Sequence, residues 1–306
     1  MKQYLEQFFK EYEWPEEAGK AVLGFCEKFW QNKRLGRLLE KDMEIYGQNV
    51  EADCTAMGTE LVAEAEKEGL NPWETWQLFY LCLSRQLPVH YQQRGLSQKV
   101  CRESLFDLKW KAMECRKVYG VWGNFTQDWF AGFLRMERFT LGRLQFEIMK
   151  EAPSGCPKEW KALGRPFVNV HIPEAGPLKH EACEQAYRQG EEFWEEKLHL
   201  SNPIFFCDSW LLFPGHRKML PPESNIRRFQ DDYALYETYE DKEGHDLWRI
   251  FGKLYDGNPE TLPENTSLQK AYKKWLLEGR VPGAGRGILG KKRSLRADFS
   301  ACGGSP

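Results

Sequence analysis

Hydrophobic residues over the first 119 positions recur at the spacing of helices. Near the N-terminus a repeat of three to four residues puts four apolar side chains on one face: Leu5, Phe8, Phe9 and Tyr12. Further on, Asn71 followed by Pro72 has the chemistry of a helix start, and an apolar helix is expected from there through residue 87, ended by Pro88. Ser97 is expected to begin another helix that runs to about residue 119. The pattern therefore predicts an all-helical domain over residues 1–119.

The pattern changes to strict alternation in residues 142–150 and again in residues 167–172, which is typical of strands with two different faces. The apolar positions of the two segments are Leu144, Phe146 and Ile148, and Val168, Val170 and Ile172. If the two strands pair antiparallel, one face of the sheet carries five polar residues: Arg143, Gln145, Glu147, Asn169 and His171.

Two interpretations of this polar face are open. A face washed by solvent would explain the polar residues without any function. Alternatively, the face lines a cleft in which Glu147 or His171 serves as a general base. Partial burial raises the pKa of a glutamate, and histidine already titrates near neutral pH, so either residue could accept a proton there.

Residues 165–198 predict a strand, a turn and a long amphipathic helix. Gly176 precedes Pro177, and the proline is expected at the first position of the helix. The first N–H groups of a helix have no helical acceptor and lie at the positive end of its dipole, so such a start can hold an anion. An ordinary helix start in an α/β domain would show the same residues.

Residues 204–213, IFFCDSWLLF, indicate a central strand that is buried on both faces. Asp208 and Ser209 interrupt the apolar run. Two polar side chains inside such a strand must find hydrogen-bond partners or face a site. Both a structural role and a catalytic or ligand-binding role are therefore open for this pair.

The last third of the chain predicts short elements. Ser224 or Asn225 is expected to cap a short helix, and residues 234–241 and 246–251 are expected to form a hairpin. Thr266 and Gln269 have the spacing of a capping box at the start of another helix. Residues 285–290, GRGILG, match the spacing of a phosphate loop but follow a helix instead of a strand, so we interpret residues 280–290 as a packed turn. Residues 291–306 are expected to be a flexible tail without a core.

Composition narrows the class of protein. Lys and Arg number 43 against 45 Asp and Glu, and this balance argues against a dedicated nucleic-acid binder. There is no apolar run long enough to cross a membrane, and the N-terminus does not resemble a signal peptide. The nine cysteines are scattered without a Cys-x-x-Cys pair, so neither a metal site nor a disulfide framework is expected. Reduced thiols in the cytoplasm are the simplest interpretation.

Several blocks of the sequence resemble a known family. These blocks are GRLQFE (142–147), HIPEAGPL (171–178), CDSWLL (207–212), SNIRRFQ (224–230) and PENTSLQKA (263–271). They are similar to the bacterial acyltransferase domain-containing proteins, in which an N-acyltransferase N-terminal helical domain precedes a GNAT-like C-terminal domain. The resemblance implies an α+β protein, with the helical domain at 1–119 and a GNAT-like mixed α/β domain at 120–290.

The resemblance also implies a chemistry, in which an acyl group moves from acetyl-CoA or another acyl-CoA to an amine on a small-molecule acceptor. By analogy with the superfamily, the loop after the central strand would bind the cofactor pyrophosphate through Ala175, Gly176, Leu178 and Lys179. Glu147 or His171 would act as the base, and Ser209 or Tyr233 would protonate the leaving thiolate. Substrate-binding roles would fall to Arg143, Gln145, Asn169 and Asp208.

The chain departs from that superfamily at two points. The superfamily signature [RQ]xxGx[GA] does not occur in the expected loop, and Pro177 removes one N–H donor there. In addition, the family often has histidine where this chain has Asp208. A non-catalytic GNAT-like module that binds a metabolite or a protein is therefore the alternative function, and the acyl acceptor and the oligomeric state are left open.

Overall fold

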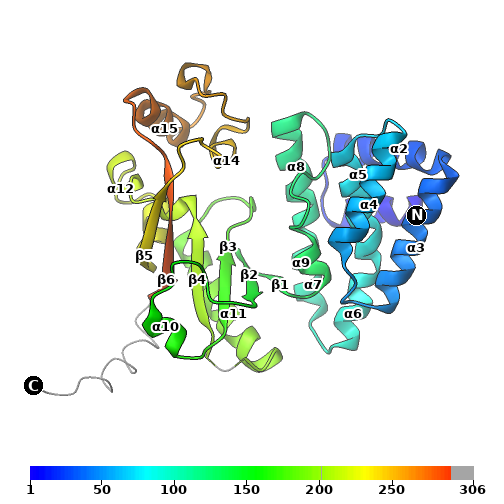
Figure 1. The fold of residues 1–306 in the computed structure, drawn as a ribbon, viewed down its shortest axis with the longest axis horizontal. Coiled ribbons are helices and arrows are strands. Elements are labelled where there is room, and N and C mark those ends of the chain that lie inside the picture. Colours follow the sequence, from blue (N-terminus) through cyan, green and yellow to red (C-terminus); the bar gives the residue numbers. More distant parts are fainter. Residues whose placement is uncertain (201, 291–306) are drawn as a thin grey trace, which may run out of the picture. The chain divides into compact units, whose positions relative to one another are not determined.

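The computed structural model describes residues 1–200 and 202–290, and the expected tail at 291–306 lies outside them (Figure 1). Contacts divide the chain into two compact units. The first comprises Met1–Leu141 together with Pro173–Ala175, and the second comprises Gly142–Ile172 and the chain from Gly176 onward. Residues 120–141, which the sequence analysis assigns to the second domain, are thus grouped with the helical unit.

The first unit is helical, as predicted. Its helices are α1 (Lys2–Glu11), α2 (Glu16–Gln31), α3 (Lys33–Gln48), α4 (Cys54–Lys67), α5 (Pro72–Leu83), α6 (Leu87–Gln93), α7 (Gln98–Leu105), α8 (Asp107–Tyr119) and α9 (Ala131–Leu134). The 3₁₀ turn η1 (Ser84–Gln86) joins α5 to α6, and the short strand β1 (Arg138–Leu141) closes the unit. The predicted cap is confirmed, because Asn71 Oδ1 accepts from the N–H groups of Trp73 and Glu74.

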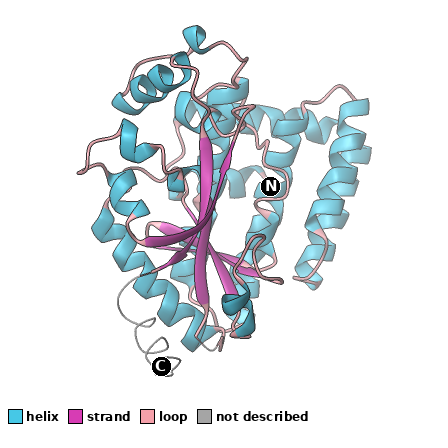
Figure 2. Cartoon of the chain, turned by 60° about the vertical axis from the view of Figure 1, so that its left-hand side comes forward, coloured by secondary structure: helices cyan, strands magenta, loops and turns pink. Residues whose placement is uncertain are grey.

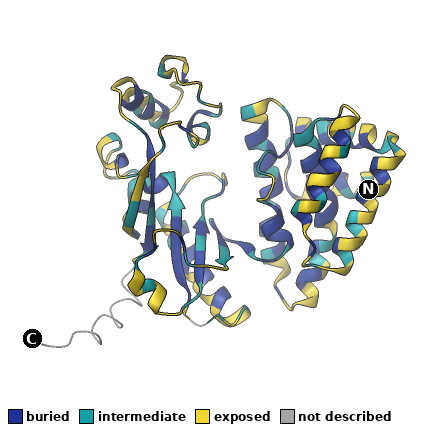
Figure 3. Ribbon diagram, in the orientation of Figure 1, coloured by how far each residue is buried: buried dark blue, intermediate teal, exposed yellow. Residues whose placement is uncertain are grey.

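Two predicted boundaries in this unit are wrong. Pro88 lies in the first turn of α6 instead of ending a helix, a position where a missing N–H costs nothing. The helix that begins after Ser97 is broken at Phe106 into α7 and α8. Helix α5 is buried on every side from Thr75 to Leu83, and helices α2, α3, α4 and α8 pack against it (Figure 3).

The second unit contains five strands that form a mixed sheet (Figure 2). They are β2 (Leu144–Met149), β3 (Phe167–His171), β4 (Ile204–Ser209), β5 (Tyr233–Glu240) and β6 (Gly283–Leu289), in the spatial order β2-β3-β4-β6-β5. Only β3 and β4 run parallel; the other neighbouring pairs are antiparallel. This confirms the predicted α+β class and the antiparallel pairing of the two alternating segments.

The helices of this unit are α10 (Lys158–Ala162), α11 (His180–Glu192), α12 (His216–Met219), α13 (Asn225–Gln230), α14 (Trp248–Phe251) and α15 (Ser267–Leu277). Ser224 caps α13, and the capping box of Thr266 and Gln269 opens α15, as predicted. Pro177 does not open α11: the helix begins at His180, after an extended Lys179, and a short π-helical segment, Phe193–Lys197, continues it.

The expected hairpin and the expected turn at 280–290 are also wrong. Residues 248–251 form helix α14, and β5 pairs instead with β6, which is the segment interpreted as a turn. The glycines of β6 explain the difference, because they lack the side-chain alternation that identifies a strand and permit unusually close packing. A Cβ at Gly283 would lie 2.4 Å from Tyr239 O, and one at Gly285 would lie 2.7 Å from Leu212 O. The GRGILG spacing therefore belongs to a strand and forms no phosphate loop.

The eight cysteines in the described residues are buried, and no disulfide joins any two of them. Within those same residues, no helix has the length and the apolar character needed to span a bilayer.

Candidate functional site

The register of β2 and β3 creates the central feature of the candidate site. Gln145 lies opposite His171, and Glu147 lies opposite Asn169, so all four side chains share one face of the sheet. Diagonally across the two strands, His171 Nε2 lies 2.8 Å from Glu147 Oε2. Their side chains are 17% and 19% exposed. Such a carboxylate orients the imidazole and stabilises its protonated form.

The neighbours of this pair are also withdrawn from solvent. Gln145 is fully buried. Asn169 Oδ1 is buried and has no hydrogen-bond partner among the described residues. A face simply washed by solvent would not bury these amides, and an unsatisfied buried carbonyl oxygen is costly unless another group reaches it. This arrangement favours the cleft interpretation of the polar face.

The parallel strands β3 and β4 part beside this pair. Their ladder joins Phe167–Asn169 to Ile204–Phe206 and goes no further, although β3 continues to His171 and β4 to Ser209. Where β3 and β4 are still paired, the same face of the sheet is apolar, and the segment after β2 covers it. One buried cluster there consists of Cys156, Phe167, Ile204, Phe206 and Ile288, with Trp160 packed on it. The polar half of the face begins where that cluster ends.

Asp208 lies on this polar face at the end of β4, where it forms a network with the next two strands. Arg286 of β6 donates to Asp208 at 2.7 Å and to Glu237 of β5 at 2.7 Å, and the hydroxyl of Tyr239 donates to Asp208 at 2.6 Å. Partial burial lowers the pKa of Arg286, but the hydrogen bonds that Arg286 donates to the two carboxylates outweigh it and the net pKa is raised. Asp208 is therefore held in place by two partners, Arg286 and Tyr239.

Sequence reasoning missed Arg286, Glu237 and Tyr239. The sequence pattern of residues 280–290 predicts a turn, and a turn gives no reason to place Arg286 beside Asp208. The available signal was a single charged residue, Arg286, within the otherwise apolar run GAGRGIL.

Ser209 and Tyr233 are not brought together with the Glu147–His171 pair. Strand alternation places both on the opposite face of the sheet. Ser209 Oγ accepts from the N–H of Leu211 at 3.2 Å and caps a 3₁₀ turn. The ring of Tyr233 packs against the ring of Tyr187 of α11, and burial raises the pKa of Tyr233.

The proposed cofactor loop is braced by Arg143. Its guanidinium donates to Gly176 O at 2.8 Å and to Pro177 O at 3.2 Å. Gly176 has a φ of +89°, and a Cβ there would meet nothing within 4 Å. The N–H of Ala175 already donates to Pro173 O at 2.8 Å, and Ala175 is grouped with the helical unit.

The start of α11 follows this loop directly. Lys179 is exposed and extended at the N-cap, and Leu178 is half-buried. The N–H groups of Ala182 and Cys183 both bond to Lys179 O at 3.1 Å. The positive end of α11 therefore lies at His180 and Glu181, directly after Lys179, and such a helix start favours an anion.

Both halves of the chain match known domain families. Residues 3–136 match the N-acyltransferase N-terminal domain, and residues 139–289 match the GNAT-like C-terminal domain. The chain therefore carries both domains, in this order, and the two matches together span nearly the whole described chain. A comparison with curated proteins gives no match.

Solved structures share the fold of this chain. An acyltransferase in complex with decanoyl-CoA and teicoplanin is 21% identical, with a TM-score of 0.75 over 93% of this chain and 86% of that chain. An acyltransferase mutant in complex with octanoyl-CoA is 20% identical, with a TM-score of 0.74 over 95% of this chain and 88% of that chain. At this identity the likeness establishes the shared fold.

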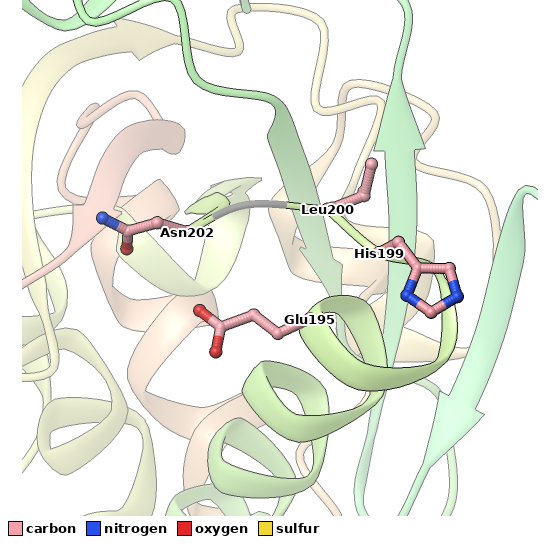
Figure 4. Close-up of a pocket in the computed structure, with 4 residues that line it drawn as sticks. All are labelled: Glu195, His199, Leu200 and Asn202. Atoms are coloured by element: carbon pink, nitrogen blue, oxygen red, sulfur yellow. The ribbon is translucent and has the colours of Figure 1, made fainter.

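A separate open hollow of about 470 Å³ lies at the end of the π-helical segment (Figure 4). It is lined by Glu195, His199, Leu200 and Asn202, and none of the candidate site residues lines it. The side-chain oxygen of Asn202 already accepts from Arg165 at 2.6 Å. We assign no function to this hollow.

Proposed function

We propose that this protein transfers an acyl group from an acyl-CoA thioester to an amine of a small-molecule acceptor. The hydrogen bond between His171 and Glu147, at the point where β3 and β4 separate, carries the proposal. An amine attacks a thioester only in its neutral form, so a base must remove a proton from it. The imidazole of His171 accepts that proton, and Glu147 stabilises the imidazolium that results. The C–N bond forms as the C–S bond of the thioester breaks, and the CoA thiolate leaves as the thiol after it takes up a proton from the imidazolium or from water.

The second unit has residues suited to the cofactor phosphates. Lys179 and the start of α11 would bind the pyrophosphate, and Arg143 holds the Gly176–Pro177 carbonyls in place. The open space beside Gly176 allows a phosphate to approach the backbone there. These features replace the missing [RQ]xxGx[GA] signature. Backbone N–H groups at the separated strand ends would polarise the thioester carbonyl.

The structural neighbours support the same chemistry and suggest the acyl length. They were solved with decanoyl-CoA, octanoyl-CoA and CoA, and two of them with teicoplanin or its acylated form. By analogy we propose a medium-chain acyl-CoA as the donor. The proposed acceptor is a small molecule that carries an amine. Gln145, Asn169 and Asp208 are the proposed acceptor contacts.

A non-catalytic binding module is the competing function, favoured by the absent phosphate signature. Release of the CoA thiol from decanoyl-CoA, followed colorimetrically in the presence of a panel of primary amines, separates the two. The transferase proposal expects amine-dependent thiol release that is lost in His171→Ala. If decanoyl-CoA binds but no amine gives thiol release above the enzyme-free rate, the binding module is correct.

A further inference from the structure

The loop after strand β3, residues 173–177, has a backbone suited to more than one conformation. Glu174, Gly176 and Pro177 are exposed, so packing holds little of the loop. Gly176 has a φ of +89° and no side chain to restrict its rotation. The prolines at both ends of the loop have no N–H to donate. Side chains from outside the loop are therefore needed to hold it in one conformation.

An ion pair supplies the first of these outside contacts. The ammonium of Lys117 donates to the carboxylate of Glu174. Contacts group Pro173–Ala175 with Met1–Leu141, so this pair lies within the helical unit. The first part of the loop is thus tied to the helical unit, although it follows a strand of the sheet.

The lysine is the fixed member of this pair. Lys117 lies in the last turn of α8. Leu108, Ala112 and Cys115 of the same helix are fully buried, and α8 packs against α5 and α7. Because the core anchors the helix whereas the loop is exposed, the ion pair restricts the loop and not the helix.

Arg143 supplies the second contact, on the other side of the Ala175–Gly176 peptide bond. Its guanidinium donates to Gly176 O at 2.8 Å and to Pro177 O at 3.2 Å. Gly176 therefore lies between two side chains that hold the loop, and its backbone can turn most freely when one of them is lost. The proposed cofactor phosphate approaches the backbone at this glycine, so the conformation of the loop should determine the affinity for the donor.

We propose that Lys117 is a positioning residue for the acyl-CoA, because its ion pair with Glu174 holds residues 173–177 in the conformation that binds the cofactor. This inference rests on the proposed acyl transfer, which takes that loop as the cofactor site. The apparent affinity for a ligand falls in proportion to the fraction of chains in the binding conformation. The two side chains are 48% and 44% exposed, and an ion pair so exposed changes an equilibrium by up to about fivefold.

Reversing the two charges tests the proposal, with the Kd of decanoyl-CoA for the full chain measured by titration calorimetry. Lys117→Glu and Glu174→Lys should each raise the Kd by about three- to tenfold, because each turns attraction into repulsion. The double variant should return to within about twofold of the wild type. Arg37→Glu, at an exposed arginine of α3, makes the same change in net charge as Lys117→Glu and should leave the Kd unchanged.

Glu174→Lys distinguishes positioning from simple attraction. A lysine added to the cofactor loop would attract the anionic phosphates and lower the Kd, whereas loss of the ion pair raises it. The ratio of the Kd of Lys117→Glu to that of the wild type should also decrease in about 0.5 M sodium chloride, because salt screens an exposed pair. In thiol-release assays, Lys117→Glu should raise the KM for decanoyl-CoA and leave kcat unchanged.

Tighter donor binding by Glu174→Lys, a double variant no better than the single ones, or a lowered kcat with an unchanged KM would overturn the role of Lys117. No binding of decanoyl-CoA to the wild type would overturn this inference together with the proposed donor. Binding that follows the expected order of variants, but without amine-dependent thiol release in the wild type, would remove the transferase function and leave the positioning role in place.

Discussion

At the scale of single residues, the hydrogen bond between His171 and Glu147 carries the proposed chemistry. Its length of 2.8 Å, together with the low exposure of both side chains, keeps the imidazole in one orientation and one tautomer. Asp208 is different, because its carboxylate oxygens already accept hydrogen bonds from Arg286 and from the Tyr239 hydroxyl. Glu147 and His171 are therefore the residues whose loss should affect proton transfer.

Replacing either member of this pair should lower turnover. We expect His171→Ala and Glu147→Gln each to reduce the initial rate of CoA thiol release by about 100-fold or more, because general-base catalysis contributes on that order. The matched control is Glu159→Gln, which removes an exposed carboxylate of α10 in the same unit and should retain the wild-type rate. Near-wild-type turnover in both site variants would exclude the pair as the base.

A second histidine should make stability depend on pH. His216 is fully buried, with Nε2 2.5 Å from the Tyr272 hydroxyl, and burial lowers the pKa of His216 to about 4. The ordinary value is near 6.5, so between pH 6.5 and 4 the unfolded chain binds a proton that the folded chain does not. The free energy of unfolding should therefore be at its full value above pH 6.5 and fall below it.

The expected loss at pH 4 from this group is on the order of 3 kcal/mol. Urea denaturation at a series of pH values measures it. His216→Gln should be less stable than the wild type at neutral pH, because the Tyr272 hydroxyl loses the imidazole nitrogen with which it forms a hydrogen bond. The free energy of unfolding of this variant should, however, fall less steeply between pH 6.5 and 4. An identical slope in the variant and the wild type would show that other groups dominate.

At the scale of elements, glycines mark where helices approach most closely. A Cβ at Gly58 of α4 would lie 2.0 Å from the ring of Trp76 of α5, whereas one at Gly24 of α2 would meet nothing within 4 Å. The first glycine is required by packing between two helices. The second only adds backbone freedom to the unfolded chain.

These two glycines should therefore respond oppositely to the same substitution. Gly58→Ala should lower the free energy of unfolding by about 1–3 kcal/mol, because the Trp76 ring must move within a closely packed core. Gly24→Ala should raise it by roughly 0.5–1 kcal/mol through helix propensity. Denaturant unfolding of the two variants measures both, and a stabilising Gly58→Ala would contradict the observed packing.

At the scale of the whole molecule, the fold that this chain shares with solved acyltransferases extends over more than nine-tenths of its length. An acyl-CoA is the proposed donor, and we expect it to bind the folded chain and not the unfolded one. Binding to the folded state alone raises its stability in proportion to the logarithm of ligand concentration.

Decanoyl-CoA should raise the melting temperature of the chain more than CoA alone. At a concentration 100 times the Kd the expected stabilisation is about 2.7 kcal/mol. His171→Ala should show a similar shift, because that residue acts on the proton and not on the phosphates. Differential scanning fluorimetry measures both, and no shift for any acyl-CoA at millimolar concentration would remove the donor from the proposal.

Much of this protein was predictable from local patterns. Helical periodicity identified the first domain, and strand alternation placed Gln145, Glu147, Asn169 and His171 on one face with the correct antiparallel pairing. These features depend on side-chain order over a few residues, which a sequence displays directly. The capping box at Thr266 is local in the same sense.

The tertiary structure alone decided which distant segments pair. The glycine-rich strand β6 has too few side chains to reveal its period, and only its fit between β4 and β5 makes it a strand. Arg286 reaches Asp208 across 78 residues of sequence, and no local pattern encodes such a contact. The opposite orientation of Ser209 likewise followed from the register between strands. The sequence by itself therefore determined the helical domain and the polar strand face, because both arise from periodicity, whereas long-range packing determined the ion-pair network beside that face.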